Sequence, residues 1–229
     1  MNTTKALECL LEYSKKSIKD KNKLSVDDDY GNRALILLCQ SKYNYDLGLP
    51  YFSELEGWPP PPVYELRDAI FQSYRYDKIE ELAERKYVAD ILLKRNFDTD
   101  FYINSITNLL KKSFLKGLSE QEKYEITHLC WCLIMIGKDN YILATHRDLL
   151  YNALTHIYQT SHNTDVGTEA LYFLSLIDPR MIKEQWIISL SKSQNKDGCF
   201  SGVSREQVAH HTGLALLTFY NYTNEEDYS

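Results

Sequence analysis

A layout that recurs along the chain constrains the fold more than any other feature of the sequence. Four segments start with polar, chemically reactive side chains and continue as apolar stretches. Their polar residues Asp90, His128, Glu169 and His211 follow one another at intervals of about 40 residues. This period suits a repeated pair of helices, in which one helix is buried all round and the other faces water. The sequence therefore predicts an all-α protein of repeated helical hairpins.

Apolar residues at helical spacing and capping signals indicate where the helices lie. We expect helices at 4–19, 30–42, 63–75, 78–95, 99–115, 120–136, 144–160, 164–177, 180–193 and 206–222. Gly117 suits a helix end, and Ser119 with Glu122 three residues later forms a predicted capping box. Asp178 and Pro179 together indicate that one helix stops and another starts. No segment shows sustained alternation of period two, so no sheet is expected.

Residues 43–62 interrupt the helical pattern. Pro50, Gly57 and the run Pro59–Pro62 cannot continue a helix and favour an extended segment. The same stretch contains several aromatic side chains, so we expect a Pro-rich surface loop that serves as a lid or as a strap for a partner. A ligand for a proline-recognition domain is an alternative. Apart from this loop, residues 1–229 are expected to form a single all-α domain.

Charge and hydropathy exclude several classes of function. The net charge is −6 and the basic residues are scattered, whereas a nucleic-acid partner requires basic residues gathered on one face. No apolar run approaches the roughly 20 residues of a membrane span, and the N-terminus resembles an amphipathic helix more than a signal peptide. The five cysteines, Cys9, Cys39, Cys130, Cys132 and Cys199, lie mostly in apolar helical patterns. We therefore expect reduced thiols in a cytoplasmic protein.

The recurring polar residues define a candidate site. If the inner helices run in the same direction, their N-termini meet at one mouth, and Asp90, His128, Glu169 and His211 converge there. The histidines are candidates for general acid–base catalysis, with the two carboxylates orienting them. His128, Glu169 and His211 also form a set of two imidazoles and one carboxylate that suits Zn(II) or Fe(II). A buried hydrogen-bond network that only joins the helices is the alternative, and in that case no cofactor is needed.

One segment resembles a motif of the α/α-toroid proteins, which include terpene cyclases, protein prenyltransferase β subunits and lanthionine cyclases. Residues 194–200, QNKDGCF, are similar to their Gln-x-x-Asp-Gly-Gly-Trp/Phe turn, with Cys199 in place of the second glycine. The resemblance implies an incomplete α/α toroid or a half-barrel. In the prenyltransferases an Asp-x-Cys pair and a His-Thr pair supply zinc ligands, which implies an alternative metal set of Asp197, Cys199 and His211.

A second resemblance covers residues 80–222. The order and spacing of four short motifs are similar to those of an uncharacterised bacterial helical family encoded in natural-product and modified-peptide biosynthesis clusters. These motifs are Tyr87 with Asp90, Thr127-His128, Asp165 with Glu169, and His211-Thr212. The resemblance implies a biosynthetic or tailoring role, and we expect Tyr87, Asp165 and His210 to contact substrate.

Two functions remain open from the sequence. The first is an enzyme whose polar, metal-binding or metal-free site acts on a peptide or a small apolar substrate. The second is a non-catalytic helical-repeat module that binds a peptide or a protein partner through a concave surface. No phosphate-binding Gly-rich loop and no nucleophile elbow occurs in the sequence, which argues against nucleotide binding and Ser-His-Asp catalysis.

Overall fold

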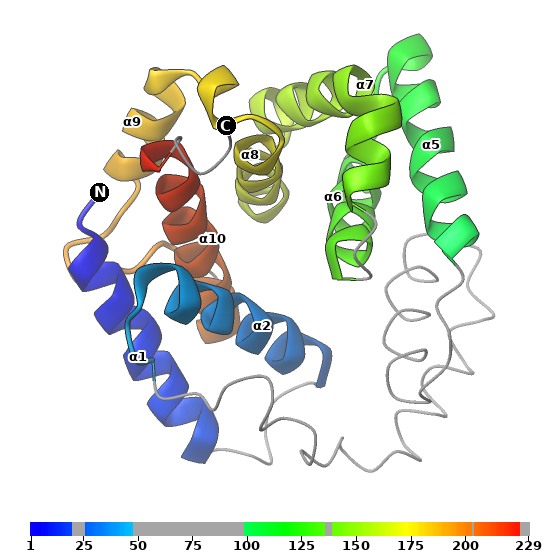
Figure 1. The fold of residues 1–229 in the computed structure, drawn as a ribbon. Helices are drawn as coiled ribbons and strands as arrows, with labels where there is room; N and C mark the ends of the chain where they lie inside the picture. The colour runs from blue at the N-terminus through cyan, green and yellow to red at the C-terminus, as the bar shows by residue number, and fades with distance from the viewer. Residues whose placement is uncertain (20–25, 48–98, 136–138, 203, 225–229) are drawn as a thin grey trace, which may run out of the picture. The chain divides into compact units, whose positions relative to one another are not determined.

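Helices dominate the part of the chain that the structure, a computed structural model, describes: residues 1–19, 26–47, 99–135, 139–202 and 204–224 (Figure 1). These ranges contain α1 (Thr3–Lys19), α2 (Val26–Tyr43), α5 (Thr99–Lys116), α6 (Glu120–Met135), α7 (Asp139–Thr160), α8 (Thr164–Ile177), the 3-10 helix η2 (Pro179–Met181), α9 (Glu184–Lys192) and α10 (Arg205–Thr223). The same ranges contain no strand, only an isolated bridge between Gln194 and Phe200. The predicted all-α class is confirmed.

Most predicted helix limits agree with the structure, and the differences have local causes. α8 has the predicted limits, 164–177. α2 starts at Val26, four residues before the predicted start at residue 30. The predicted helix 180–193 is divided, because Asp178 accepts a hydrogen bond from the backbone N–H of Arg180 and caps the short η2 before α9 begins. The predicted helices 63–75 and 78–95 and most of the Pro-rich loop lie outside the described residues.

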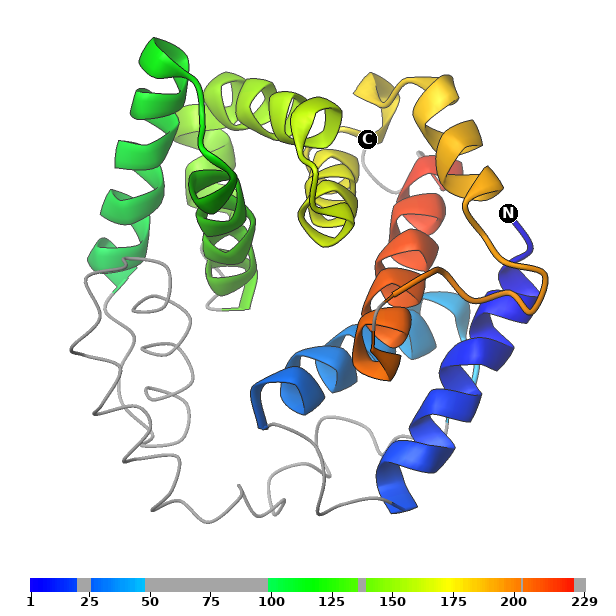
Figure 2. The ribbon, with the colours of Figure 1, turned by 180° about the vertical axis from the view of Figure 1, so that it is seen from behind.

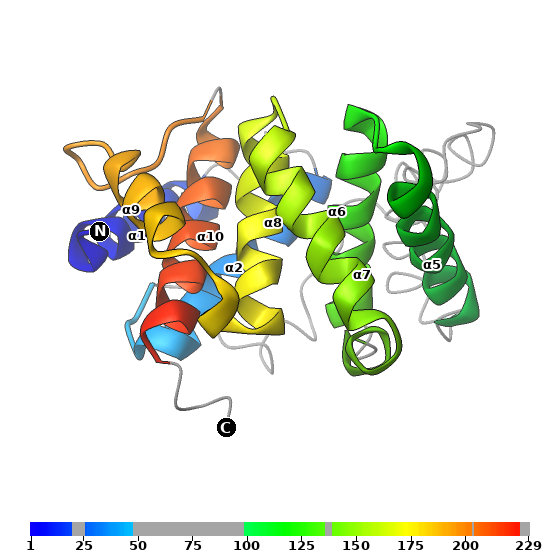
Figure 3. The same ribbon diagram turned by 90° about the horizontal axis from the view of Figure 1, so that it is seen from above.

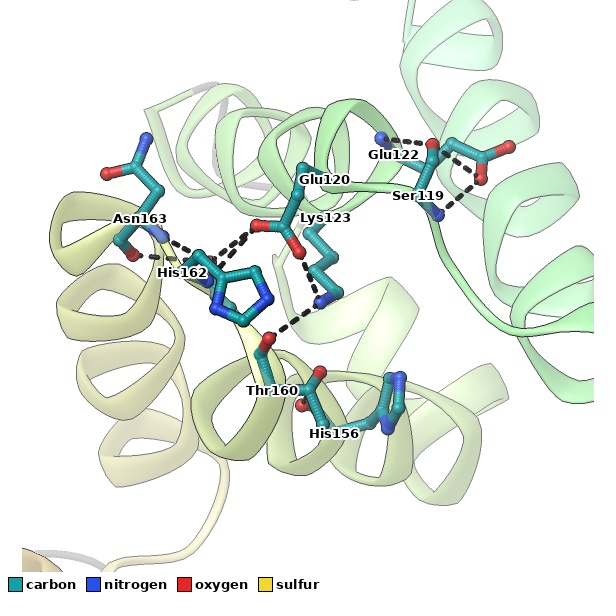
Figure 4. Close-up of polar contacts among 9 residues, drawn as sticks. Ser119, Glu120, Glu122, Lys123, His156, Thr160, His162 and Asn163 are labelled. Carbon is teal, nitrogen blue, oxygen red and sulfur yellow. Dashed lines mark hydrogen bonds and ion pairs between the residues drawn. The ribbon is translucent and has the colours of Figure 1, made fainter.

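The predicted capping box at the start of α6 is confirmed (Figure 4). The backbone N–H of Glu122 donates to Ser119 Oγ at 3.3 Å, and the N–H of Ser119 donates to the Glu122 carboxylate at 2.9 Å. Gly117, which ends the preceding turn, has φ +74°, a conformation that glycine adopts without steric cost. The limits of α6 are therefore set by these local side chains.

The chain divides into two compact units. The first combines both ends of the chain, residues 1–58 and 174–229, and the second is residues 59–173. α8 crosses the boundary, with Thr164 to Phe173 in the second unit. The toroid arrangement and the single domain stay predictions. Among the described helices, none has both the length and the hydropathy that crossing a bilayer requires.

The first unit is built around α10. In the ribbon, α1 and α2 both pack against α10, and α2 crosses it (Figure 2). The crossing is close at Gly213, because a Cβ there would lie 2.6 Å from Leu35 Cδ2. Tyr43 Oη donates to the carbonyl of Leu216 at 2.7 Å, which fixes the other end of the crossing. The absence of a side chain at Gly213 thus sets how closely the two helices pack.

The second unit packs α5, α6 and α7 together (Figure 3). Each helix buries apolar side chains three or four residues apart, as an amphipathic helix does. The fully buried members include Tyr102, Ile106 and Leu110 of α5, Ile126, Leu129 and Leu133 of α6, and Leu154 and Ile157 of α7. This core holds α6 in place and so positions the polar side chains that α6 presents to α8.

Candidate functional site

Two of the predicted site residues come together where α6 meets the first part of α8. Tyr124, His128 and Trp131 lie at positions i, i+4 and i+7 of α6 and therefore share one face of the helix. On α8, Glu169 and Tyr172 share the opposing face. Nε2 of His128 lies 3.9 Å from Oε2 of Glu169. The predicted proximity of His128 and Glu169 is a feature of the structure.

Glu169 is the most deeply buried acid of the site. Its side chain is 2% exposed, whereas that of His128 is 14% exposed. The indole N–H of Trp131 donates to Oε1 of Glu169 at 2.9 Å. A buried carboxylate is costly unless it is hydrogen-bonded or paired with a positive charge. The indole N–H supplies the hydrogen bond, and the neighbouring imidazole supplies a positive charge whenever it is protonated.

Aromatic rings fix the orientation of the polar side chains. The ring of Tyr124 stacks on the imidazole of His128, with centroids 3.7 Å apart and planes 28° apart. Trp131 stacks on Tyr172 at 5.3 Å and meets the edge of Phe173 at 5.2 Å. These contacts restrict the side-chain rotamers of His128 and Trp131. The polar side chains are therefore held in defined orientations by their aromatic neighbours.

Cys130 lies beside this cluster, but its thiol is not reactive. The side chain is buried, and its burial raises the pKa of the thiol well above its usual value. The negative charge of Glu169 raises the pKa further. Because the thiolate is the nucleophile and the metal ligand, a thiol that stays protonated is inert. This supports a structural role for the Cys130 side chain.

His211 lies in the first unit, and it holds a loop. Its Nδ1 is 2.6 Å from the carbonyl oxygen of Ser201. A carbonyl oxygen only accepts hydrogen bonds, so Nδ1 carries the proton in this contact. The neighbouring Thr212 accepts a hydrogen bond from the backbone N–H of Phe200 at 3.1 Å. Convergence of His211 with His128 and Glu169 stays a prediction.

The alternative metal set of Asp197, Cys199 and His211 is wrong for this structure. Cys199 forms a disulfide with Cys9, so its sulfur is not a thiolate that could bind zinc. Asp197 instead accepts a hydrogen bond from the backbone N–H of Cys199 at 3.0 Å, which stabilises the turn. The expectation that these two cysteines are reduced is wrong for the same reason.

The expected position of the site residues at helix N-termini also needs correction. Ser204 caps α10 by accepting a hydrogen bond from Gln207, so His210 and His211 lie beyond the first turn. His128 likewise lies well inside α6, beyond Ser119 and its capping box. The macrodipole acts mainly within the first turn. The chemistry of His128 thus depends on its side-chain neighbours.

Other predicted site residues have different positions. Asp165 is half-buried in the first turn of α8, and His210 is half-buried in α10. Tyr87 and Asp90 lie outside the described residues. Within the described ranges, no group of three or more His, Cys, Asp or Glu side chains is arranged to hold a metal ion.

Trp131, which donates a hydrogen bond to Glu169, was not among the predicted site residues. Its position three residues after His128 places it on the same face of α6, and an indole N–H needs an acceptor when buried. The sequence analysis also missed the role of Lys123, whose buried ammonium pairs with Glu120 at 2.6 Å and donates to the carbonyl of Thr160 at 3.1 Å (Figure 4). Those contacts join α6 to the end of α7.

Comparison with known proteins gives no assignment for this arrangement. No protein-family model, curated protein or solved structure matches the chain. The resemblances to the α/α-toroid proteins and to the bacterial biosynthetic-cluster family therefore stay predictions. The function has to be argued from the residues around His128 and Glu169.

Proposed function

We propose that the chain is an enzyme in which His128 transfers protons and Glu169 orients its imidazole. The observation that supports this most strongly is the contrast in exposure within the pair. Glu169 is almost completely buried, whereas the His128 side chain keeps 14% of its surface accessible. A ligand can therefore reach the imidazole but not the carboxylate. His128 is the candidate catalytic residue, and Glu169 and Trp131 are positioning residues.

The chemistry of the pair suits acid–base catalysis. An imidazole gains and loses a proton near neutral pH, and a neighbouring carboxylate stabilises the charged form. The 3.9 Å between the His128 and Glu169 atoms is longer than a hydrogen bond. Catalytic hydrogen bonds are often long in unliganded enzymes and shorten when substrate binds. The aromatic rings around the pair favour a substrate with an apolar part, such as a peptide or a small apolar molecule.

A metal-dependent form of this proposal uses the same residues. His128 and Glu169 offer an imidazole and a carboxylate, ligand types that Zn(II) and Fe(II) both accept. His211 was predicted as the third ligand. Metal analysis of the untagged protein separates the two forms: about one equivalent of bound metal supports the metal site, and its absence together with unchanged stability in a chelator supports the metal-free site.

The test compares His128→Gln with the matched control His156→Gln, because His156 is an exposed histidine of the same unit (Figure 4). Each protein is incubated with a panel of peptides and small apolar compounds, and products are detected by mass spectrometry. We expect the wild type and His156→Gln to convert the same compound. His128→Gln should convert it about 100-fold to 10,000-fold more slowly, the usual contribution of general acid–base catalysis.

Equal turnover by His128→Gln and the wild type would contradict the proposal. A panel in which the wild type binds a peptide but converts nothing would favour the alternative, a non-catalytic module that binds a peptide or protein partner. Circular dichroism of each variant shows whether a loss of turnover comes from unfolding.

A further inference from the structure

The N-terminal residues of the chain and the loop before α10 are joined by reciprocal hydrogen bonds. We call residues 193–202 the clasp loop. The backbone N–H of Asn2 donates to Oε1 of Gln194 at 2.7 Å, and Nε2 of Gln194 donates back to the carbonyl of Asn2 at 2.9 Å. Nζ of Lys5 donates to the carbonyl of Lys196 at 2.9 Å. All three contacts are exposed, so water competes for each of them.

A disulfide reinforces these contacts. Cys9 of α1 is bonded to Cys199 of the clasp loop, with Cα atoms 5.6 Å apart and 190 residues between them in sequence. The two backbones are close because Gly198 has no side chain. A Cβ at Gly198 would lie 2.4 Å from Cβ of Lys5. The clasp loop therefore fits α1 only while its backbone keeps this conformation.

The other side of the clasp loop is held by α10. Thr212 Oγ1 accepts a hydrogen bond from the backbone N–H of Phe200 at 3.1 Å, and Nδ1 of His211 donates to the carbonyl of Ser201 at 2.6 Å. Phe200 and Ser201 directly follow Cys199. A displacement of Cys199 would thus act on the hydrogen bonds of His211 and Thr212.

We propose that the Cys9–Cys199 disulfide is a site of thiol–disulfide exchange with a dithiol reductant, and that its redox state controls whether the clasp loop stays bound to α1. Both cysteines are half-buried residues, and exchange requires a thiolate to reach one of the two sulfurs. In the reduced form no covalent bond holds the loop to α1, and the hydrogen bonds of Asn2 and Lys5 with the loop are exposed to water. This inference does not depend on the proposed role of His128.

The dithiol alone supplies the two electrons and two protons that reduction of the disulfide requires. One thiolate of the dithiol attacks a sulfur of the Cys9–Cys199 bond and forms a mixed disulfide, while the other cysteine leaves as a thiolate and takes up a proton. The second thiolate of the dithiol then attacks the mixed disulfide and releases the remaining cysteine. Two electrons and two protons pass to the protein, and the dithiol becomes a cyclic disulfide.

The test uses the full-length chain, dithiothreitol as the dithiol, and trypsin as the probe of the clasp loop at Lys196. Protein purified without reductant should give a linked peptide that contains Cys9 and Cys199, and dithiothreitol should convert both to alkylatable thiols. Cleavage at Lys196 should become at least about 10-fold faster after reduction, because cleavage follows the population of the open form. Cleavage at Lys111 and Lys112 of α5 should not change, and removal of the reductant should restore slow cleavage at Lys196.

Two variants act as controls. The double variant Cys9→Ser/Cys199→Ser should be cleaved quickly with or without dithiothreitol, whereas Gln194→Ala keeps the disulfide and should stay slow until it is reduced. Free thiols at Cys9 and Cys199 in the air-oxidised protein, or unchanged cleavage at Lys196 on reduction, would overturn the proposal. An equal acceleration at Lys111 would also overturn it, because reduction would then unfold the whole chain. If the double variant does not fold, the proposal is still tested by the rate of cleavage at Lys196 when the wild type is reduced and then reoxidised.

Discussion

At the scale of single residues, the site depends on Glu169. Its buried carboxylate accepts the Trp131 N–H and faces His128, so its removal leaves a buried indole N–H without its acceptor. We predict that Glu169→Ala lowers the free energy of unfolding by roughly 1–3 kcal/mol, measured by urea denaturation. The exposed Glu8 of α1 offers the control, since Glu8→Ala should stay within about 0.5 kcal/mol of the wild type. If the two substitutions changed the free energy of unfolding equally, the contacts of Glu169 would not contribute to stability.

Glu122 should make stability depend on pH in the acidic range. The Lys112 ammonium and the Ser119 N–H hold the pKa of the Glu122 carboxyl below its usual value of 4.5. A lowered folded-state pKa stabilises the fold above the unfolded pKa, and this stabilisation is lost as the pH falls through the folded value. We predict that Glu122→Gln is less stable than the wild type at pH 7 and that the difference shrinks by pH 3. A difference that is constant over this range would contradict the assignment.

At the scale of elements, two glycines should respond in opposite ways to substitution by alanine. Packing and backbone conformation decide the effect at Gly198, and helix propensity decides it at Gly167. Gly198 has φ +93°, and a Cβ there would meet Lys5, whereas a Cβ at Gly167 in α8 would meet nothing within 4 Å. We predict that Gly198→Ala lowers the free energy of unfolding by roughly 2–4 kcal/mol, from backbone strain plus the clash. Gly167→Ala should instead raise it by up to about 1 kcal/mol. Thermal or urea unfolding of the two variants decides this, and a tolerated Gly198→Ala would show that the clasp loop does not lie against α1.

Helix limits could be predicted from the sequence better than contacts between residues far apart in the chain. The limits of α6 and α8 follow from local signals, such as the Ser119 and Glu122 capping box, and local signals can be recognised in a sequence. The pairing of His128 with Glu169 agrees with the 40-residue period. The disulfide was not predictable, because Cys9 and Cys199 are far apart in sequence and no spacing rule links them. The hydrogen bond of His211 to Ser201 was also missed, since it depends on the path of the clasp loop.

At the scale of the whole molecule, the two ends of the chain form one unit. Residues 1–58 and 174–229 belong together, and the Cys9–Cys199 bond joins them across 190 residues. Closure of so long a loop restricts the unfolded chain strongly. We predict that reduction lowers the free energy of unfolding of this first unit by roughly 3–5 kcal/mol. Urea denaturation with and without dithiothreitol measures this, and Cys9→Ser/Cys199→Ser should match the reduced wild type. Superimposable curves for the oxidised and reduced wild type would contradict it.

The central claim is that His128 and Glu169 act together as an accessible acid–base pair. The most direct test is a double-mutant cycle of His128→Gln and Glu169→Gln, with the free energy of unfolding measured at pH 5.5 and at pH 8.5. We predict a coupling of about 1–2 kcal/mol at pH 5.5 that falls markedly at pH 8.5, because only the charged imidazole is attracted to the carboxylate. Additive effects at both pH values, within about 0.3 kcal/mol, would contradict the pairing on which the proposed function rests.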